Sequence, residues 1–224
     1  MDVTYELRSL MAELGADLAD CADLADLGCG WPRGLAVAKR IPPEVLSDME
    51  NGPTRLYYDT YHALNSDLDK LMLAAEDFLT AQGHAAWAQT TGRVVTVHAR
   101  TLLPHKSIAM RAGLGWLGKS NLLVTPQYGS AVRLSSLVTD APLTPGAPMP
   151  ESRCGGCTAC LRACPAGAIR GTLWQAGTDR DEMFDMPACD AKARTMSLEN
   201  YGISTALCGQ CFLKCPYTLR ALRK

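Results

Sequence analysis

Residues 154–165 read Cys-Gly-Gly-Cys-Thr-Ala-Cys-Leu-Arg-Ala-Cys-Pro, and residues 208–216 read Cys-Gly-Gln-Cys-Phe-Leu-Lys-Cys-Pro. Together with Cys189, these two runs place eight of the chain's ten cysteines in its last 71 residues. Eight thiolates are the number that two [4Fe–4S] clusters require, four for each cluster. The spacing therefore predicts two such clusters, and with them an iron–sulfur redox protein.

The Pro that follows the last Cys of each run is typical of the bacterial ferredoxin pattern, in which that last Cys ligates the other cluster. The second run has only three cysteines, so Cys189 must supply the missing thiolate. The predicted ligands of the first cluster are Cys154, Cys157, Cys160 and Cys215. The predicted ligands of the second cluster are Cys164, Cys189, Cys208 and Cys211. We expect the other two cysteines, Cys21 and Cys29, to be buried, inert thiols that touch neither cluster.

Two other uses of cysteine fit this chain less well. A zinc ribbon accounts for only four ligands and leaves both Cys-x3-Cys-Pro endings unexplained. A disulfide framework belongs to small secreted domains, whereas this chain begins with an amphipathic helical pattern ended by Gly15 rather than with a signal peptide. No apolar run approaches the length of a membrane span. The predicted setting is a reducing, cytoplasmic one.

The composition predicts two domains. Four prolines fall between residues 141 and 150, where they exclude a continuous helix or a central strand. This linker separates residues 1–140, an α+β cofactor or substrate domain, from residues 151–224, a ferredoxin-like two-cluster domain. With 47% hydrophobic residues, the first domain can bury a core of its own. A net charge of −1 gives the chain no global field that would recruit nucleic acid or an anionic membrane.

Periodicity within the first domain predicts a mixed, partly antiparallel sheet with helices packed on it, in an α/β-sandwich-like arrangement. Helical spacing of apolar residues from Gly52 to Gly83 indicates one long helix or two in close succession. The strand-like segments are 34–41, 93–98, 121–125 and 130–139. The strand order does not follow from the sequence.

Residues 113–120, Gly-Leu-Gly-Trp-Leu-Gly-Lys-Ser, match both G-x-G-x-x-G and the P-loop pattern G-x4-G-K-S. Both phosphate-binding motifs need a strand before the loop and a helix after it. Here the preceding residues 105–112 have helical character, and the following residues 121–125 resemble a strand. We therefore interpret the segment as a glycine-rich turn that either cradles a cofactor beside the clusters or simply holds Trp116 in the core. The alternative function, a P-loop ATPase coupled to electron transfer, requires a strand directly before Gly113.

The run from Pro104 to Asp140, followed by the double-cluster cysteines, closely resembles the epoxyqueuosine reductase family, and most of all its short iron–sulfur members. Residues 52–62 are similar to those short members as well. This family is related to the reductive dehalogenases. The resemblance implies a cobalamin held base-off between an α+β domain and a ferredoxin-like domain. It also implies that electrons pass from an external low-potential donor through both clusters to cobalt, which then reduces the substrate.

The family's cofactor-lining segments correspond here to the glycine turn and to a Gly-Ser pair. The implied cofactor-binding residues are Gly113, Gly115, Trp116, Gly118, Lys119, Gly129 and Ser130. The family's acidic proton donor has no counterpart at residues 96–100, which read Thr-Val-His-Ala-Arg. Candidate catalytic proton donors are therefore His105, His98 and Tyr58, together with the neighbouring Tyr57 and Tyr61. His105 is preferred because it adjoins the glycine turn.

The sequence favours a small-molecule substrate and argues against tRNA. No basic face interleaved with aromatic residues is evident, and the chain ends nine residues beyond Cys215 without the helical repeats of the tRNA-modifying enzymes. Two rival functions remain open at this point: an electron-transfer protein with no corrinoid, and a flavin-linked reductase. The substrate, the electron donor and the oligomeric state do not follow from the sequence.

Overall fold

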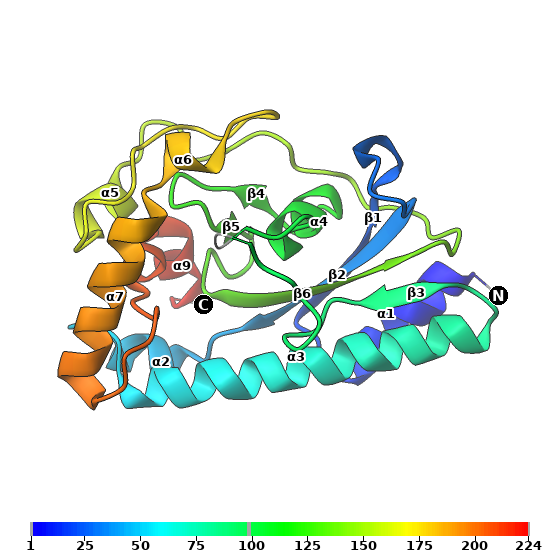
Figure 1. Cartoon of the computed structure of the whole chain (residues 1–224), viewed down its shortest axis with the longest axis horizontal. Helices are drawn as coiled ribbons and strands as arrows, with labels where there is room; N and C mark the ends of the chain where they lie inside the picture. The colour runs from blue at the N-terminus through cyan, green and yellow to red at the C-terminus, as the bar shows by residue number, and fades with distance from the viewer. Residues whose placement is uncertain (1, 98–99, 224) are drawn as a thin grey trace. The chain divides into compact units, whose positions relative to one another are not determined.

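The computed structural model describes residues 2–97 and 100–223 (Figure 1). The chain forms two compact units, and each is built from three separate segments. Unit one comprises residues 1–40, 63–115 and 133–149, and unit two comprises residues 41–62, 116–132 and 150–224. The sequence predicts two consecutive domains, 1–140 and 151–224, and whether these segments fold independently stays a prediction. The compact units of the structure differ from them, because each unit takes segments from both parts of the chain.

Unit one contains a four-stranded sheet in the order β1-β2-β6-β3. The strands are β1 (Leu18–Asp23), β2 (Arg33–Arg40), β3 (Ala86–Ala88) and β6 (Val132–Thr139). Strand β1 pairs antiparallel with β2 through Cys21 opposite Leu35, and β3 pairs antiparallel with β6 through Trp87 opposite Val138. The predicted α+β class with antiparallel pairing is confirmed at these two pairs.

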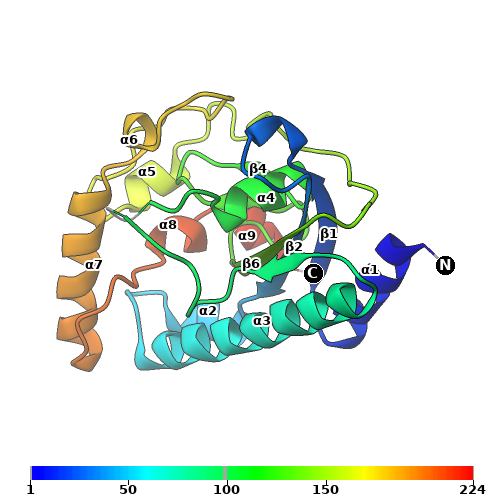
Figure 2. The ribbon, with the colours of Figure 1, turned by 45° about the vertical axis from the view of Figure 1, so that its right-hand side comes forward.

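Helices cover both faces of this sheet. Figures 1 and 2 show α1 (Val3–Glu13) and α3 (Arg55–Ala81) on one face and α4 (His105–Arg111) on the other. The alternation of β2 explains the division, because Leu35 and Val37 join the core cluster with α1 and α3, whereas Gly34 approaches Ile108 of α4. A Cβ atom at Gly34 would lie 3.0–3.1 Å from Leu24, Ile108 and Leu137, so a larger residue there would crowd α4 against the sheet.

The two long helices form where the sequence is most clearly periodic. Helix α1 begins with the Asp2 carboxylate accepting the Thr4 N–H at 2.9 Å, and it ends just before Gly15 at φ 90°. In α3, apolar residues recur three and four positions apart, and the buried ones are Leu64, Leu68, Leu71, Met72, Ala75 and Leu79. One continuous helix of 27 residues therefore replaces the predicted choice between one helix and two.

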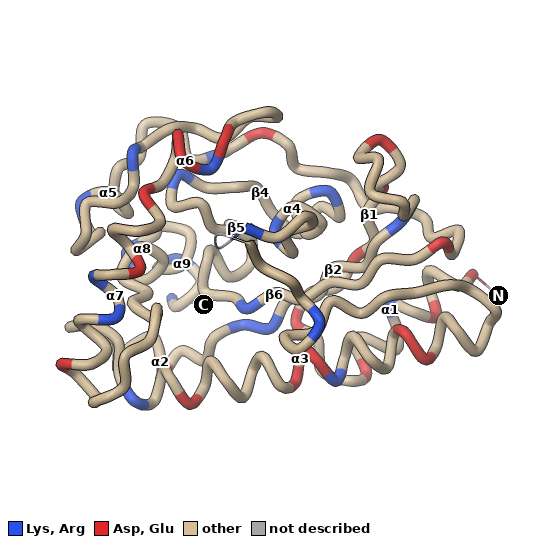
Figure 3. The backbone as a smooth tube through the Cα atoms, viewed as in Figure 1, with Lys and Arg blue, Asp and Glu red and all other residues tan. Residues whose placement is uncertain are grey.

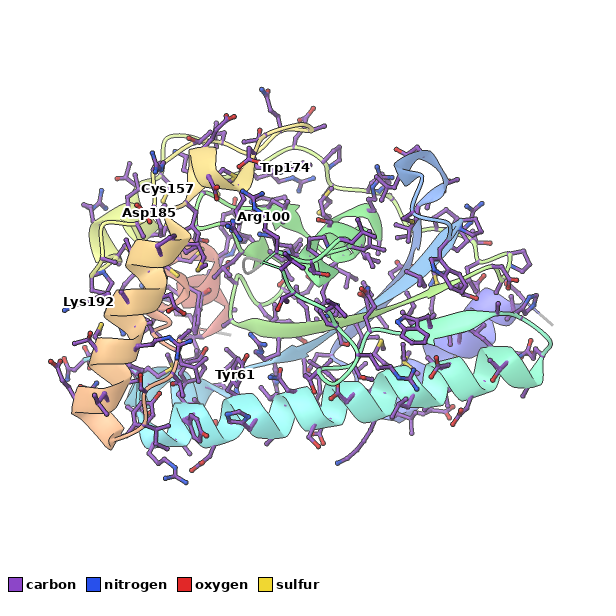
Figure 4. All side chains as sticks on the ribbon, in the orientation of Figure 1. Tyr61, Arg100, Cys157, Trp174, Asp185 and Lys192 are labelled. Atoms are coloured by element: carbon purple, nitrogen blue, oxygen red, sulfur yellow. The ribbon has the colours of Figure 1, made fainter. Side chains whose placement is uncertain are left out.

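Unit two combines short helices with one small hairpin. Its elements are α2 (Pro43–Asp48), the first part of α3, β4 (Trp116–Leu117), β5 (Leu123–Val124), α5 (Ala159–Ala163), α6 (Arg180–Met183), α7 (Met186–Tyr201), α8 (Gln210–Leu213) and α9 (Pro216–Ala221). Strands β4 and β5 are antiparallel, with Trp116 opposite Val124. The Asp185 carboxylate, labelled in Figure 4, caps α7 by accepting the Ala188 N–H at 3.0 Å. The helices that carry the cysteines are thus fixed by local capping and turns.

Two expectations about the strands need correction. Residues 93–97 do not form a strand but follow a turn in which Arg93 N and Val94 N both donate to Thr90 O at 3.0 Å. Among the residues that the structure describes, this stretch pairs only through the isolated antiparallel bridge between Val97 and Arg100. The sequence also missed strand β1 and the strand β3, which is short and Ala-rich.

The order of elements around the glycine turn is as the sequence predicts. Helix α4 precedes Gly113, and the β4–β5 hairpin follows it. A phosphate-binding loop needs the opposite order, so its backbone N–H groups could not converge at a helix N-terminus here. This arrangement excludes the P-loop ATPase alternative.

Candidate iron–sulfur and cofactor site

The eight C-terminal cysteines are close enough to influence one another's ionisation, and they do so in two sets. Burial raises the pKa of the Cys160 thiol, and the charges of Cys154, Cys215 and Cys157 raise it further. Three cysteines of the first run are therefore close to Cys215, the last cysteine of the second run. This is the crossing that the Cys-Pro endings predict for the first cluster.

The second set is centred on Cys189, which lies in α7 outside any Cys-x2-Cys spacing. Burial raises the pKa of Cys189 to about 11, with further contributions from Cys164, Cys208 and Asp190. Burial likewise raises the pKa of Cys211, which feels Cys208, Cys189, Cys164 and, least, Cys160. These four thiols form the neighbourhood expected for the second cluster.

The donor chemistry of both sets fits iron–sulfur clusters. All ten cysteines lie in the described part of the chain and are free thiols. Because burial raises thiol pKa values here, cluster assembly must displace protons from the sulfur atoms, as metal binding to cysteine generally does. Among the described residues, no three Cys, His, Asp or Glu side chains converge as they would around a single metal ion. A [4Fe–4S] cluster spreads its four thiolates over four iron atoms, so it does not need that convergence.

The second half of the glycine turn packs against the first thiol set. A Cβ atom added at Gly118 would be 3.5 Å from the Cys154 sulfur and less than 3.0 Å from a methyl of Val124. The next residue, Lys119, is 7% exposed, and its Nζ donates to the Cys157 carbonyl at 3.1 Å. Figure 4 labels Cys157 on the segment that leads into α5. Gly118 and Lys119 thus position the loop that carries the first cysteines.

The first half of the turn has a different packing partner. Gly113 has φ 83°, and a Cβ atom there would clash with the Ala147 carbonyl. Close packing within unit one therefore explains this glycine without a ligand. Gly115 also belongs to unit one, whereas Trp116, Gly118 and Lys119 belong to unit two.

The Gly-Ser pair lies against the residues that follow Cys215. Gly129 has φ 59°, and an added Cβ atom would be less than 3.0 Å from the N, Oγ1 and Cα atoms of Thr218. Ser130 N donates to Thr218 Oγ1 at 3.1 Å. Burial raises the pKa of Cys215, and hydrogen bonds from the Thr218 and Tyr217 backbone N–H groups lower it. Sequence reasoning missed Tyr217 and Thr218, although their place directly after the last Cys-Pro pair could have indicated them.

Two polar atoms of the predicted cofactor-lining residues are buried without a hydrogen-bond partner. They are Trp116 Nε1 and Ser130 Oγ, on residues that are 1% and 4% exposed. The Trp116 ring meets the Tyr217 ring edge-on at 4.8 Å between centroids, and Arg153 lies over its face at 5.6 Å. Buried donors are rarely left unpaired, so these two atoms fit a polar ligand bound beside the first thiol set.

His105, the preferred proton donor, is neutral at physiological pH. Burial is the main cause that lowers its pKa from 6.5 to about 4, and the charge of the nearby Arg133 acts in the same direction. Gln89 Nε2 donates to Ser136 Oγ, which lies 2.8 Å from His105 Nδ1. The bond between Ser136 and Nδ1 is compatible with either tautomer of a neutral His105, because a serine hydroxyl can both donate and accept. His105 can therefore offer a hydrogen bond, but the low pKa counts against an imidazolium acting as general acid.

The other proton-donor candidates are scattered. Tyr58 packs in an aromatic group with His62 at 4.5 Å and Tyr201 at 5.8 Å between ring centroids. Tyr57 is buried edge-on against Phe212, as a core residue would be. His98 lies outside the described residues. The upstream thiols differ from each other, because Cys21 is fully buried in the sheet core, whereas Cys29 is half-buried with its sulfur 3.4 Å from the Trp31 carbonyl oxygen.

Comparison with protein families identifies the cysteine-rich segment. Residues 153–218 match the 4Fe-4S double cluster binding domain. The chain is 38% identical over 111 residues to the epoxyqueuosine reductase of Bacillus subtilis, which covers 50% of this chain and 26% of that protein. It is 31% identical over 166 residues to the epoxyqueuosine reductase of Lactococcus garvieae, covering 71% and 42%. The chain thus matches less than half the length of these curated relatives.

Solved structures share the fold over nearly the whole chain. A crystal structure of epoxyqueuosine reductase with an epoxyqueuosine-modified tRNA-Tyr stem loop aligns with a TM-score of 0.61 at 22% identity, over 96% of this chain and 65% of that one. A reductive dehalogenase described as carrying out B12-dependent dehalogenation aligns with a TM-score of 0.73 at 16% identity, over 97% and 32%. Both likenesses establish the fold.

The expectation that tRNA is excluded as a partner is wrong for this group of proteins, because a relative with this fold has been solved with a tRNA stem loop. The physical reason is local. Between Asp77 and Asp140 the chain has none of its 23 acidic residues but six of its 22 Lys and Arg, so the net charge of −1 conceals a basic segment. Figure 3 shows Lys and Arg positions along α4 and β6 of unit one.

None of the helices in the described residues combines the length and apolar character of a membrane span. The cysteine spacing, the double-cluster match, the curated relatives and the shared fold all agree with the resemblance seen in the sequence. The chain is a short iron–sulfur relative of the epoxyqueuosine reductases.

Proposed function

We propose that this protein is an iron–sulfur reductase that passes electrons through two [4Fe–4S] clusters to a cobalamin-type cofactor and then to a modified nucleoside in tRNA. The cysteine sets support the clusters, and the relatives' described activity supports the substrate class. The cysteine spacing, which suits cluster ligation rather than a disulfide framework, supports a reducing, cytoplasmic setting.

The observation that carries the cofactor proposal is the pair of orphaned donors at Trp116 Nε1 and Ser130 Oγ. They flank the Tyr217–Thr218 backbone, whose N–H groups bond to the Cys215 sulfur. A corrinoid has amide side chains that can accept from such donors. When bound, the corrinoid would supply the reducing equivalents for the substrate, and Trp116, Gly129 and Ser130 would hold it.

The same contacts support an order in which electrons pass through the two clusters. The predicted cofactor-lining residues that approach a thiol set in the described part of the chain approach the first set. Gly118 packs near the Cys154 sulfur, and Lys119 bonds to the Cys157 carbonyl. Gly129 and Ser130 contact Thr218, whose N–H bonds to Cys215. The first cluster is therefore the one proposed to deliver electrons inward. The second cluster, with Cys164, Cys189, Cys208 and Cys211, would receive them from an external low-potential donor.

Removing an epoxide oxygen as water consumes two electrons and two protons. We propose that His105 serves as a hydrogen-bond donor through Nε2 in this reaction, with burial keeping the imidazole neutral and Ser136 donating to Nδ1. His98 and Tyr58 remain predicted sources of the transferred proton.

The test is anaerobic reconstitution of the full chain with iron and sulfide, followed by incubation with hydroxocobalamin and gel filtration. We expect about eight iron atoms per chain, co-eluting corrinoid, and loss of one oxygen from an epoxyqueuosine-bearing tRNA stem loop on addition of a low-potential reductant, measured by mass spectrometry. Iron with no retained corrinoid would favour an electron carrier, and retained flavin would favour a flavin-linked reductase.

A variant pair makes the cofactor test specific. Trp116→Phe keeps an aromatic ring and removes the orphaned Nε1 donor, so it should weaken corrinoid retention without changing the iron content. Trp174→Phe makes the same chemical change elsewhere in unit two and should retain corrinoid like the wild type. Equal retention by both variants would contradict the proposed role of Trp116.

A further inference from the structure

Unit one contains a cavity of about 210 Å³ beside the edge strand β3. Its lining includes Trp31, Trp87, Gln89, Arg93, Thr101 and Leu102. Drug-sized ligands generally occupy about 300–1,000 Å³, so the cavity suits a single planar ring system better than a whole cofactor. The lining therefore combines two indole rings, an amide, a guanidinium and a hydroxyl with aliphatic side chains.

Arg93 and Trp87 form a rigid stack at this cavity. The guanidinium lies over the Trp87 ring at 5.1 Å from its centroid. It is held there by Glu76, whose two carboxylate oxygens accept from Arg93 Nη1 at 2.9 and 2.7 Å. Glu76 is itself fixed, because its side chain is 15% exposed and its Oε1 also accepts the Ala88 N–H at 3.1 Å. The arginine plane is therefore positioned before any ligand arrives.

The rim of the cavity exposes large apolar side chains to solvent. Leu102 is 91% exposed, Val95 is 75% exposed, and Trp87 itself is 48% exposed. Such a group on one surface commonly marks a binding site. The same stretch of chain lies within the acid-free segment between Asp77 and Asp140, and Arg100, labelled in Figure 4, is part of it.

We infer that this cavity binds an unstacked nucleobase of the RNA substrate. Proteins recognise single-stranded RNA loops by stacking bases on aromatic rings and on arginine planes, while amides and hydroxyls bond to base edges. Trp87 and Arg93 supply the stacking surfaces, and Gln89 and Thr101 supply the edge contacts. The inference rests on the proposed tRNA substrate and adds a place where one of its bases is bound.

The experiment measures binding of a fluorescently labelled tRNA anticodon stem loop bearing epoxyqueuosine to the reconstituted full chain, by anisotropy at several salt concentrations. Trp87→Ala removes one stacking ring, and Arg93→Lys keeps the charge but loses the planar group. Each variant should bind roughly 10- to 100-fold more weakly, the loss expected for one stacked base. Arg93→Lys should keep the wild-type salt dependence. Tyr5→Ala, at an aromatic residue that is 71% exposed on α1, is the control and should bind normally.

Iron content and retention of cobalamin and of cobinamide are measured on the same preparations. Unchanged values in Trp87→Ala alongside weakened RNA binding would support the base pocket. Wild-type RNA binding by both variants would overturn it. A loss of cobalamin retention with cobinamide retention intact would also overturn it, because the cavity would then hold the cofactor's own nucleotide. If the wild type binds no stem loop, the pocket and the tRNA substrate fail together, whereas the cluster and corrinoid proposals are judged by the iron and corrinoid measurements.

Discussion

Replacing Gly129 with alanine should damage the first cluster through Thr218. Gly129 has φ 59°, a conformation that costs an alanine roughly 1–2 kcal/mol. Its new Cβ atom would also lie less than 3.0 Å from three atoms of Thr218, one of them the backbone nitrogen that bonds to the Cys215 sulfur. Relieving that clash must move Thr218, and overpacking of this kind typically adds about 1–3 kcal/mol.

Gly167 provides a matched control for this substitution. It has the same φ of 59°, but an added Cβ atom there would meet no atom within 4 Å. Gly167→Ala therefore carries the backbone cost alone, and the difference between the two variants isolates the steric effect. At about 2–4 °C for each kcal/mol in a chain of this size, Gly129→Ala should unfold roughly 2–12 °C below Gly167→Ala.

The assay is anaerobic thermal unfolding of the reconstituted protein, followed at the cluster absorption and by circular dichroism at one heating rate. A redox titration monitored by electron paramagnetic resonance then compares the clusters. Hydrogen bonds to cluster sulfur stabilise the more negative, reduced state, so loss of the Thr218 N–H bond should lower one cluster's reduction potential and leave the other unchanged. Equal midpoints and potentials in the two variants would refute the placement of Gly129 against Thr218.

Three further predictions concern other groups. Cys189→Ala should reduce the iron content from about eight toward about four per chain, whereas Cys29→Ser should retain all of it; full iron in Cys189→Ala would exclude that thiol as a ligand. Lys119→Met should lower the reduction potential of the first cluster by removing a buried positive charge next to Cys157, and a titration showing no shift would contradict that proximity. Histidine C2-hydrogen exchange, read by mass spectrometry, should give His105 a midpoint near the pKa of about 4 that burial imposes, below the ordinary 6.5. Because the folded chain binds this proton less tightly than the unfolded chain, protonation of His105 lowers the free energy of unfolding, by at most about 3 kcal/mol. The full free energy of unfolding is therefore present above pH 6.5, and this part of it is lost as the pH falls toward 4. A midpoint near 6.5 would show that the side chain is solvated.

The sequence predicted the cluster region better than any other part, because ligand spacing is a local property. Cys-x2-Cys runs and a Cys-Pro ending constrain neighbouring sulfur atoms directly, and the grouping of Cys215 with the first run agrees with that expectation. The long helix α3 was equally accessible, since its apolar period extends over many turns.

Predictions failed where the outcome depended on neighbours distant in sequence. Residues 93–97 have the β-branched composition of a strand, but their N-terminal turn is tied to Thr90, and the described residues offer them no continuous strand partner. The orphaned donors at Trp116 and Ser130 depend on side-chain burial that no local pattern reports. The partner expectation failed because a net charge averages over the whole chain, whereas an RNA would meet one segment of it.

The interleaving of the two units has a consequence for how such a protein can be made and how it can evolve. Unit two needs residues 41–62 and 116–132 as well as the cysteine-rich end. During synthesis these earlier segments cannot complete unit two until the cysteine-rich segment has left the ribosome, so cluster insertion must follow synthesis of residues 150–224. For the same reason, a recombination event at the Pro-rich linker would transfer the cysteines without the hairpin that packs on them. Exchange of redox modules with other ferredoxin-like proteins is thereby restricted, and the cluster region is inherited together with the sheet unit that precedes it.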